Sequence, residues 1–222
     1  MASVTALPRR RAVPTPTIKH GDSMPTSVGI YLYPEVEILD FTGPYQVFST
    51  ATRLAVGGDM PPPFSTFTIA ARKGLVRARG GLVVQPNYNF ANHPAIDLLI
   101  VPGGVVNAEL ENPEVIRWIE KTSAQAGLTA AVCTGAFLLA KANVLYAHKA
   151  TTHWEDITEL KAMFPLLKVV EGCRWVDAGR YVTSAGISAG IDMSLHLVQR
   201  IAGLELAAAT ARQLDFDWRQ NS

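Results

Sequence analysis

The sequence predicts an α/β sandwich built on a mostly parallel sheet. Short apolar runs alternate with stretches of helical pattern along most of the chain, an order typical of parallel strands joined by helices. The runs are apolar throughout rather than at every second residue, as expected of strands that are covered on both faces. No repeat or linker interrupts this alternation, and 222 residues favour one domain over two.

The first 23 residues differ from the rest of the chain. They hold four basic residues against one acidic residue, with three prolines and no hydrophobic period. Such a segment cannot bury enough apolar surface to offset the entropy of ordering it. We therefore expect a disordered arm at 1–23 and a single domain at 24–222. The Arg-rich, acid-poor composition also fits a targeting peptide, although an amphipathic helical face is missing.

Apolar runs and turn residues define the elements of the first half. Residues 27–33 are expected to form a buried strand, and 43–56 a helix that is entered through a Gly-Pro pair. Residues 65–71 are rich in β-branched side chains and predict a strand. A hairpin is expected within 72–85 around two glycines, and 96–104 is a strand that ends in Pro-Gly-Gly.

The second half continues the alternation of strands and helices. Asn112 is a helix cap, and the proline after it takes the first position of a helix that runs to about Ala126. Residues 128–132 are a short apolar strand, and 134–142 the next helix. The remaining elements are helices at 153–164, 188–202 and 205–214 and strands within 166–171 and 174–184 around an Asp-Ala-Gly turn.

Composition excludes several classes of partner. Charged residues make up 18% of the chain and the net charge is +1, so neither nucleic acid nor a membrane surface is an expected partner. Two cysteines are too few for a disulfide framework, and no apolar segment reaches membrane-spanning length without a charge or a turn residue. A cytoplasmic setting is the expectation. His148 and His153 have no thiol or carboxylate to complete a ligand set, which argues against a metal site.

A reactive cysteine is predicted at the joint between a strand and a helix. Cys133 follows an apolar run and precedes a helix, which would place its sulfur near the positive end of the helix dipole and favour the thiolate. Asp40 is a carboxyl group in apolar surroundings that is able to exchange a proton, or alternatively a cap of the next helix. Amides near Cys133, with those of Gly103 and Gly104, are candidates for holding a developing negative charge.

Five motifs, in order along the chain, resemble a known family. They are YPEVEILDFTGPYQVF, IVPGG, AVCTGAFLLAKANVL, ATTHW and GISAGIDMSLHLV. From Ser27 to about Phe216 the chain resembles the ThiJ/PfpI superfamily and, within it, bacterial isocyanide hydratases. The resemblance implies a flavodoxin-like three-layer sandwich, a homodimer, and a small-molecule substrate handled without a cofactor or metal.

The resemblance also implies roles for single residues. Cys133 is the expected nucleophile and Asp40 the expected acid/base. Threonine rather than histidine follows the cysteine, which weakens a proteolytic interpretation, and the hydratases have a run of glycines where this chain has Ala185, which predicts a narrower pocket. The residues expected to form the oxyanion pocket or line the substrate are Gly103, Gly104, Thr134, His153, Ala185 and Ile187.

One motif points to a different chemistry. Ser188 lies in a G-x-S-x-G sequence between a strand and a helix, as in the serine-hydrolase elbow. The only later histidine is His196, within the same expected helix, so no base is expected over the serine. Ser188 is therefore interpreted as a helix N-cap, His196 as a packing residue, and Cys173 as structural.

The leading hypothesis is a lyase that hydrates an isocyanide to an N-formamide through Cys133 and Asp40. A ligand- or redox-sensing module is the first alternative, because related domains occur in transcription regulators. The chain ends at Ser222, directly after the last expected helix, so a DNA-binding domain is not expected. The second alternative is a glyoxalase-like enzyme acting on small aldehydes, against which the missing histidine after Cys133 counts.

Overall fold

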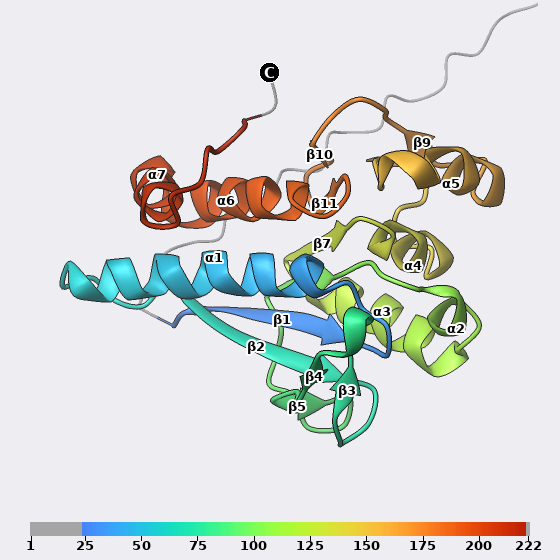
Figure 1. The fold of residues 1–222 in the computed structure, drawn as a ribbon, viewed down its shortest axis with the longest axis horizontal. Coiled ribbons are helices and arrows are strands. Elements are labelled where there is room, and N and C mark those ends of the chain that lie inside the picture. The colour runs from blue at the N-terminus through green and yellow to red at the C-terminus, as the bar shows by residue number, and fades with distance from the viewer. Residues whose placement is uncertain (1–23, 221–222) are drawn as a thin grey trace, which may run out of the picture.

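The computed structural model describes residues 24–220, so the arm expected at 1–23 lies outside the described residues. A central sheet of seven strands runs through the molecule in the order β10-β11-β7-β6-β1-β2-β5 (Figure 1). Its pairs are parallel except β10 with β11. The strands are β1 Thr26–Leu32, β2 Phe64–Ala70, β5 Tyr88–Asn89, β6 Leu98–Val101, β7 Leu128–Val132, β10 Trp175–Asp177 and β11 Tyr181–Ser184.

Helices cover both faces of this sheet and complete three layers. One group comprises α1 (Ile38–Gly57), α6 (Ala189–Ala202) and α7 (Leu204–Gln213), which pack on one another and lie together in Figure 1. The other group comprises α2 (Asn107–Leu110), α3 (Pro113–Gln125) and α4 (Gly135–Lys141). The expected α/β sandwich with a mostly parallel sheet is confirmed.

The buried strands explain why the sequence pattern was so clear. Every residue of β6 and β7 is buried, and so are the last five residues of β1. A strand with helices on both faces has no solvent side, so nothing in its sequence selects alternate polar residues. The carboxyl ends of β1, β6 and β7 meet at one edge of the sheet, which is where open parallel sheets form their sites.

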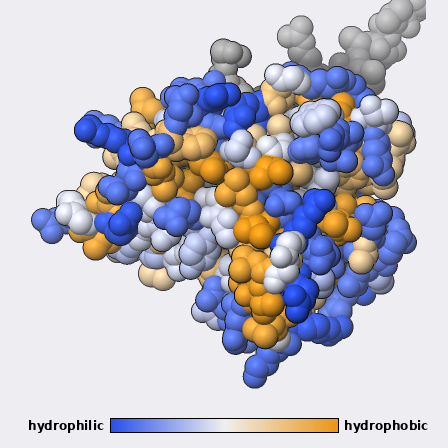
Figure 2. Space-filling view, viewed as in Figure 1, coloured by the Kyte–Doolittle hydropathy of each residue, from blue (hydrophilic) through white to orange (hydrophobic). Residues whose placement is uncertain are grey.

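Two small two-stranded sheets accompany the central sheet. The expected hairpin is present as β3 (Val76–Arg77) and β4 (Val83–Val84), with a tight turn at Arg79–Gly81 between them. Apolar side chains of this hairpin are exposed and form a patch in Figure 2. A second, parallel pair joins β8 (Lys149–Ala150) to β9 (Lys168–Val169), beside a 3₁₀ turn at Trp154–Asp156 and α5 (Ile157–Met163).

The prediction for the first helix was wrong at its start. α1 begins at Ile38 rather than at residue 43, and Pro44 lies inside it. The Glu37 carboxylate accepts a hydrogen bond from the Ile38 amide at 3.1 Å and so caps the helix. Asp40 therefore lies in the first turn and is not the cap. The short elements α2, β5 and β8 were not predicted.

None of the helices among residues 24–220 combines the length and apolarity needed to cross a membrane. The same residues contain no cluster of three or more histidine, cysteine or carboxylate side chains arranged to hold a metal ion.

Candidate active site

Cys133 lies on a strained turn between β7 and α4. Its φ is 56°, a left-handed conformation that costs free energy for a residue with a side chain. Its amide donates to the Ser184 carbonyl at 3.1 Å, and its carbonyl accepts from Thr152 Oγ1 at 2.8 Å. The next turn is equally tight, because a Cβ on Gly135 would lie 2.1 Å from the Val101 carbonyl oxygen. Backbone contacts on several sides thus hold the sulfur at the sheet edge.

The Cys133 sulfur is surrounded by backbone amides but remains a neutral thiol. The pKa of Cys133 is raised to about 12, chiefly by burial and next by the nearby Asp40 charge, against which the amides of Thr134 and Ile187 lower it. Loss of hydration therefore outweighs the helix dipole that the sequence argument invoked. The resting thiol needs a proton acceptor before it can act as a nucleophile.

Asp40 is a proton acceptor that interacts with the Cys133 side chain. The side chain is fully buried in the first turn of α1, and its Oδ2 accepts from the Gly103 amide at 3.0 Å. The pKa of Asp40 is raised to about 7 because burial outweighs the Gly103 hydrogen bond and the interaction with the Cys133 side chain, which lower it. A carboxyl group that is half ionised near neutral pH is suited to both giving and taking a proton.

Asp40 should make the stability of the fold depend on pH. Its folded pKa of about 7 lies above its ordinary value of 3.8, so its favourable contribution is complete below the ordinary value and is lost as pH rises through about 7. We expect the free energy of unfolding of Asp40→Asn to gain on that of the wild type between about pH 4 and pH 7. Urea unfolding at several pH values measures this, and parallel curves would contradict it.

The Gly103-Gly104 segment is present at the site, but its amides are already used inside the protein. Gly103 donates to Asp40, and the Gly104 amide donates to Thr134 Oγ1 at 2.9 Å. Thr134 Oγ1 in turn donates to the Gly104 carbonyl at 2.9 Å. These contacts correct the expectation that the two glycine amides face a developing charge. They position Asp40 and Thr134, and the amides that face the sulfur belong to Thr134 and Ile187.

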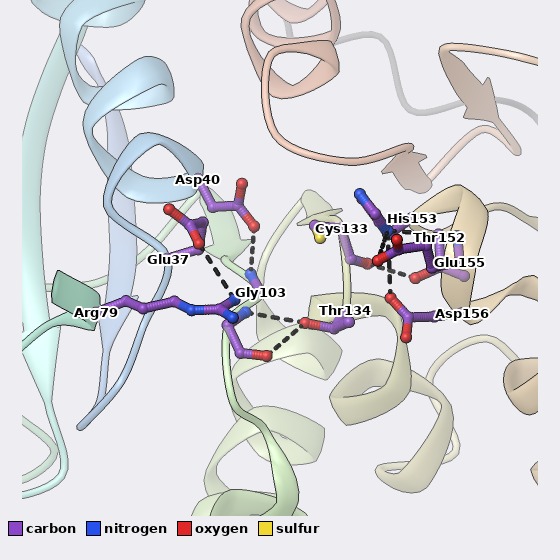
Figure 3. A network of polar contacts seen from close by, with 11 residues as sticks. Glu37, Asp40, Arg79, Gly103, Cys133, Thr134, Thr152, His153, Glu155 and Asp156 are labelled. Carbon is purple, nitrogen blue, oxygen red and sulfur yellow. Dashed lines mark hydrogen bonds and ion pairs between the residues drawn. The ribbon is translucent and has the colours of Figure 1, made fainter.

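His153 reaches the site from the segment after β8. A Cβ on Gly186 would lie 1.8 Å from His153 Cδ2, so the imidazole ring packs directly on a glycine that has no room for a side chain. The Glu155 amide donates to His153 Nδ1 at 3.4 Å, and an Asp156 carboxylate oxygen lies 3.6 Å from the same nitrogen. Figure 3 shows His153 beside the Cys133 turn.

A cavity of about 560 Å³ opens above Cys133, within the range of small-molecule sites. Gly104, Cys133, Thr134, His153 and Ile187 line it, whereas Asp40 and Gly103 lie just behind the lining and Ala185 is absent from it. The expected narrowing of the pocket by Ala185 stays a prediction. The other lining residues are Glu37, Arg79, Val105, Val106, Asn107, Leu110, Glu111, Phe137, Glu155, Asp156, Glu159 and Met163.

Several of these lining residues were not predicted. Arg79 comes from the turn of the β3–β4 hairpin and forms an ion pair with Glu37 at 3.4 Å (Figure 3). Asn107 is the first residue of α2 and Glu111 follows its last, and this helix is too short to leave a periodic signal. The one sequence feature that could have indicated a lining residue was the Glu-Val-Glu segment before Asp40. It places Glu37 near the sheet edge that carries Asp40.

The loop that carries Ile187 is held from outside the cavity. Arg174 Nε donates to the buried carboxylate of Asp192 at 2.5 Å, and Arg174 Nη2 donates to Ser188 Oγ at 3.3 Å. Ser188 precedes α6 as expected, but its side chain makes no capping hydrogen bond. The expected N-cap hydrogen bond is therefore absent, because the Ser188 hydroxyl accepts a hydrogen bond from Arg174 instead.

The G-x-S-x-G sequence does not form a hydrolase site. His196 lies within α6, stacks on Trp175 with ring centroids 4.0 Å apart, and shares a 2.7 Å hydrogen bond with Asp177. It is therefore a packing residue that also makes a hydrogen bond. Cys173 is partly buried and is not among the residues lining the cavity.

Comparisons with known proteins identify the family of the chain. The model of the DJ-1/PfpI family matches residues 26–200. An isonitrile hydratase of Pseudomonas putida is 32% identical over 199 residues, which are 87% of this chain and 79% of that protein. The HTH-type transcriptional regulator GbdR of Pseudomonas aeruginosa is 28% identical over 89% of this chain, which spans about half (52%) of the regulator's length.

Solved structures show the same fold. A ThiJ/PfpI family protein from Pseudomonas syringae matches with a TM-score of 0.78 at 23% identity, over 95% of this chain and 84% of that one. Drosophila melanogaster DJ-1beta matches with a TM-score of 0.73 at 21% identity, over 88% of this chain and 100% of that one. With the family model covering most of the folded body, the chain belongs to the DJ-1/PfpI family.

Proposed function

We propose that this protein hydrates an isocyanide to the corresponding N-formamide, with Cys133 as the nucleophile and Asp40 as the acid/base. The observation that carries the proposal is the pairing of a buried neutral thiol with a carboxyl group whose pKa lies near 7. The thiol must lose a proton to react, and the isocyanide carbon must gain one. The Asp40 carboxyl group can carry this proton from the first to the second. The similarity to an isonitrile hydratase over 87% of the chain supports the same chemistry.

In the first half of the reaction, the Asp40 carboxylate accepts the thiol proton while the sulfur bonds to the terminal carbon of the isocyanide. The proton then passes from Asp40 to that carbon. The product is a thioimidate on Cys133, and the carboxylate is restored. The Thr134 and Ile187 amides face the sulfur and stabilise its charge while the bond forms.

In the second half, Asp40 takes a proton from water as the water oxygen bonds to the thioimidate carbon, and delivers that proton to the nitrogen. The remaining hydroxyl proton moves to Asp40 as the carbonyl forms and the carbon–sulfur bond breaks. Asp40 returns this proton to the leaving sulfur. The N-formamide departs, and the thiol and carboxylate are as they began.

Ligand sensing is the second candidate, supported by the 28% identity to a transcriptional regulator over 89% of this chain. A sensor of this kind would bind its ligand without turnover. Redox sensing is less well supported, because peroxide reacts with the thiolate and burial raises the pKa of Cys133 to about 12. The homodimer implied by the family resemblance stays a prediction.

The test offers the purified protein, without added metal, a small alkyl isocyanide and methylglyoxal in parallel. We expect formation of the N-formamide with a clearly higher kcat/KM than any conversion of methylglyoxal to lactate, because selection rests on differential stabilisation of the transition state. Mass spectrometry identifies the formamide, and lactate is measured enzymatically. Asp40→Asn should suppress the formamide signal, since an amide cannot relay the proton.

Three results would overturn the assignment. Lactate accumulating while formamide forms no faster than in buffer would favour the glyoxalase-like activity. Saturable binding of the isocyanide without any product would favour a sensor. Full activity of Asp40→Asn would remove Asp40 from the mechanism.

A further inference from the structure

Acidic side chains outnumber basic ones in the lining of the cavity above Cys133. Five of its lining residues carry carboxylates, against one arginine and one histidine. The acidic residues are Glu37, Glu111, Glu155, Asp156 and Glu159. They come from the start of α1, the end of α2, the 3₁₀ turn and α5, so the charge surrounds the cavity rather than occupying one exposed helix face.

Little positive charge is left to balance these carboxylates. Arg79, the only arginine or lysine that lines the cavity, is already paired with Glu37. His153 lies 3.6 Å from Asp156 and 3.7 Å from Glu155, and can balance at most one of them. Within residues 24–220, Glu111 and Glu159 form no ion pair. The cavity therefore keeps a net negative charge.

A second observation concerns the carboxyl group beside Cys133, behind the lining of the cavity. Asp40 is fully buried, and its Oδ1 has no hydrogen-bond partner among the residues that the structure describes. Such an atom is costly unless a donor reaches it. The Cys133 sulfur, which lines the cavity, points toward this carboxyl group in Figure 3. A molecule bound over Cys133 is placed to bring the donor.

We propose that the cavity selects a small molecule with a positive charge, and that the substrate is an isocyanide that also carries an ammonium group. The substrate half of this proposal rests on the proposed function, whereas the charge selection is a property of the cavity alone. The isocyanide carbon reaches Cys133 on the floor, and the ammonium group lies among the carboxylates nearer the opening, of which Glu111 and Glu159 are the least balanced.

A bound cation would also change the nucleophile. The charges of Asp40 and Asp156 oppose ionisation of the Cys133 thiol. A positive charge in the same cavity offsets their field and makes the thiolate easier to form. Binding of the correct substrate and activation of the nucleophile are then coupled, and a neutral molecule of the same size gains less from the site.

Charge selection can be measured without any substrate, by the rate at which thiol reagents modify Cys133. Two methanethiosulfonates serve as probes, one carrying a trimethylammonium group and one a sulfonate. Each transfers its thioalkyl group to the sulfur as methanesulfinate leaves. The protein carries Cys173→Ser so that one thiol remains, and rates are divided by those of a free small thiol. We expect the cationic reagent to be favoured by about tenfold or more at low salt.

The acidic residues are then tested by substitution. Glu111→Gln/Glu159→Gln should reduce the preference for the cationic reagent by about threefold or more. The matched control is Glu120→Gln/Glu205→Gln, which changes the net charge equally at two exposed carboxylates outside the cavity lining and should leave the preference intact. Equal normalised rates for both reagents, or equal losses in both double variants, would overturn the proposal.

Substrate assays separate this inference from the proposed function. We expect kcat/KM for an ammonium-bearing alkyl isocyanide to exceed that for the neutral isocyanide of equal length by about tenfold, and the excess to shrink in Glu111→Gln/Glu159→Gln. Turnover of both isocyanides at equal rates would overturn the substrate inference while leaving the proposed function standing. Selective modification by the cationic reagent without turnover of either isocyanide would support charge selection and overturn the proposed function.

Discussion

Cys133→Ser should abolish turnover of isocyanides while leaving the fold intact. Serine is slightly smaller than cysteine and fits the same strained turn, so the contacts of Cys133 with Ser184 and Thr152, which use only its backbone, remain. A hydroxyl group is a far weaker acid than a thiol, and Asp40, with a pKa near 7, is too weak a base to ionise it. We expect kcat to fall by at least about a thousandfold.

The measurement is formamide production by the variant, with circular dichroism and urea unfolding as checks on the fold. Cys173→Ser is the matched control, because it removes the other thiol, which lies outside the cavity lining, and should keep wild-type activity. Undiminished turnover in Cys133→Ser, or a loss shared by Cys173→Ser, would remove Cys133 from the centre of the mechanism.

Of the substitutions proposed for this protein, Gly135→Ala should lower the free energy of unfolding the most. A Cβ at this position would lie 2.1 Å from the Val101 carbonyl oxygen and 2.9 Å from the Pro102 carbonyl carbon. These atoms belong to the backbone at the end of β6, so no side-chain rotation relieves the overlap. Either α4 moves away from the sheet or the Cys133 turn changes shape, and we expect the free energy of unfolding to fall by about 3 kcal/mol or more.

Gly127→Ala provides the matched control for this prediction. Gly127 lies just before β7, and Gly135 lies shortly after it. A Cβ at Gly127 would meet only the Asp97 carbonyl oxygen, at 3.6 Å, which is an ordinary contact. Its free energy of unfolding should change by less than about 1 kcal/mol. Urea unfolding of both variants decides the matter, and similar losses in the two would show that the close approach at Gly135 does not matter.

The parts of the fold that the sequence predicted are those whose evidence is local. β6 and β7 are buried on both faces, so their apolar runs are unbroken, and Asn112 with the proline that follows it marks the start of α3. The start of α1 was missed because Pro44 resembles a helix entrance, whereas the cap is the Glu37 side chain. Two-residue strands such as β5 and β8 exist only through their partners, which no local pattern specifies.

The candidate site also has parts that the sequence predicted and parts that it did not. The positions of Cys133 and Asp40 were predictable because each follows an apolar strand and a parallel sheet brings strand ends together. The use of the Gly103 and Gly104 amides was not, since only the folded chain shows that Asp40 and Thr134 occupy them. The acidic lining was also hidden, because its members come from separate elements that are distant in sequence.

The contact between His153 and Gly186 has a consequence for how this site can evolve. The ring lies where a Cβ at Gly186 would need to be. Whether a substitution at one of these positions is tolerated therefore depends on the residue at the other. A larger residue at 186 is tolerated only after the imidazole has gone, and loss of the imidazole leaves a void over the glycine. The two positions should therefore change together among descendants of this sequence, and a library that randomises position 186 alone would return mostly destabilised clones. Pairing them in a single library opens substrate shapes that stepwise substitution does not reach.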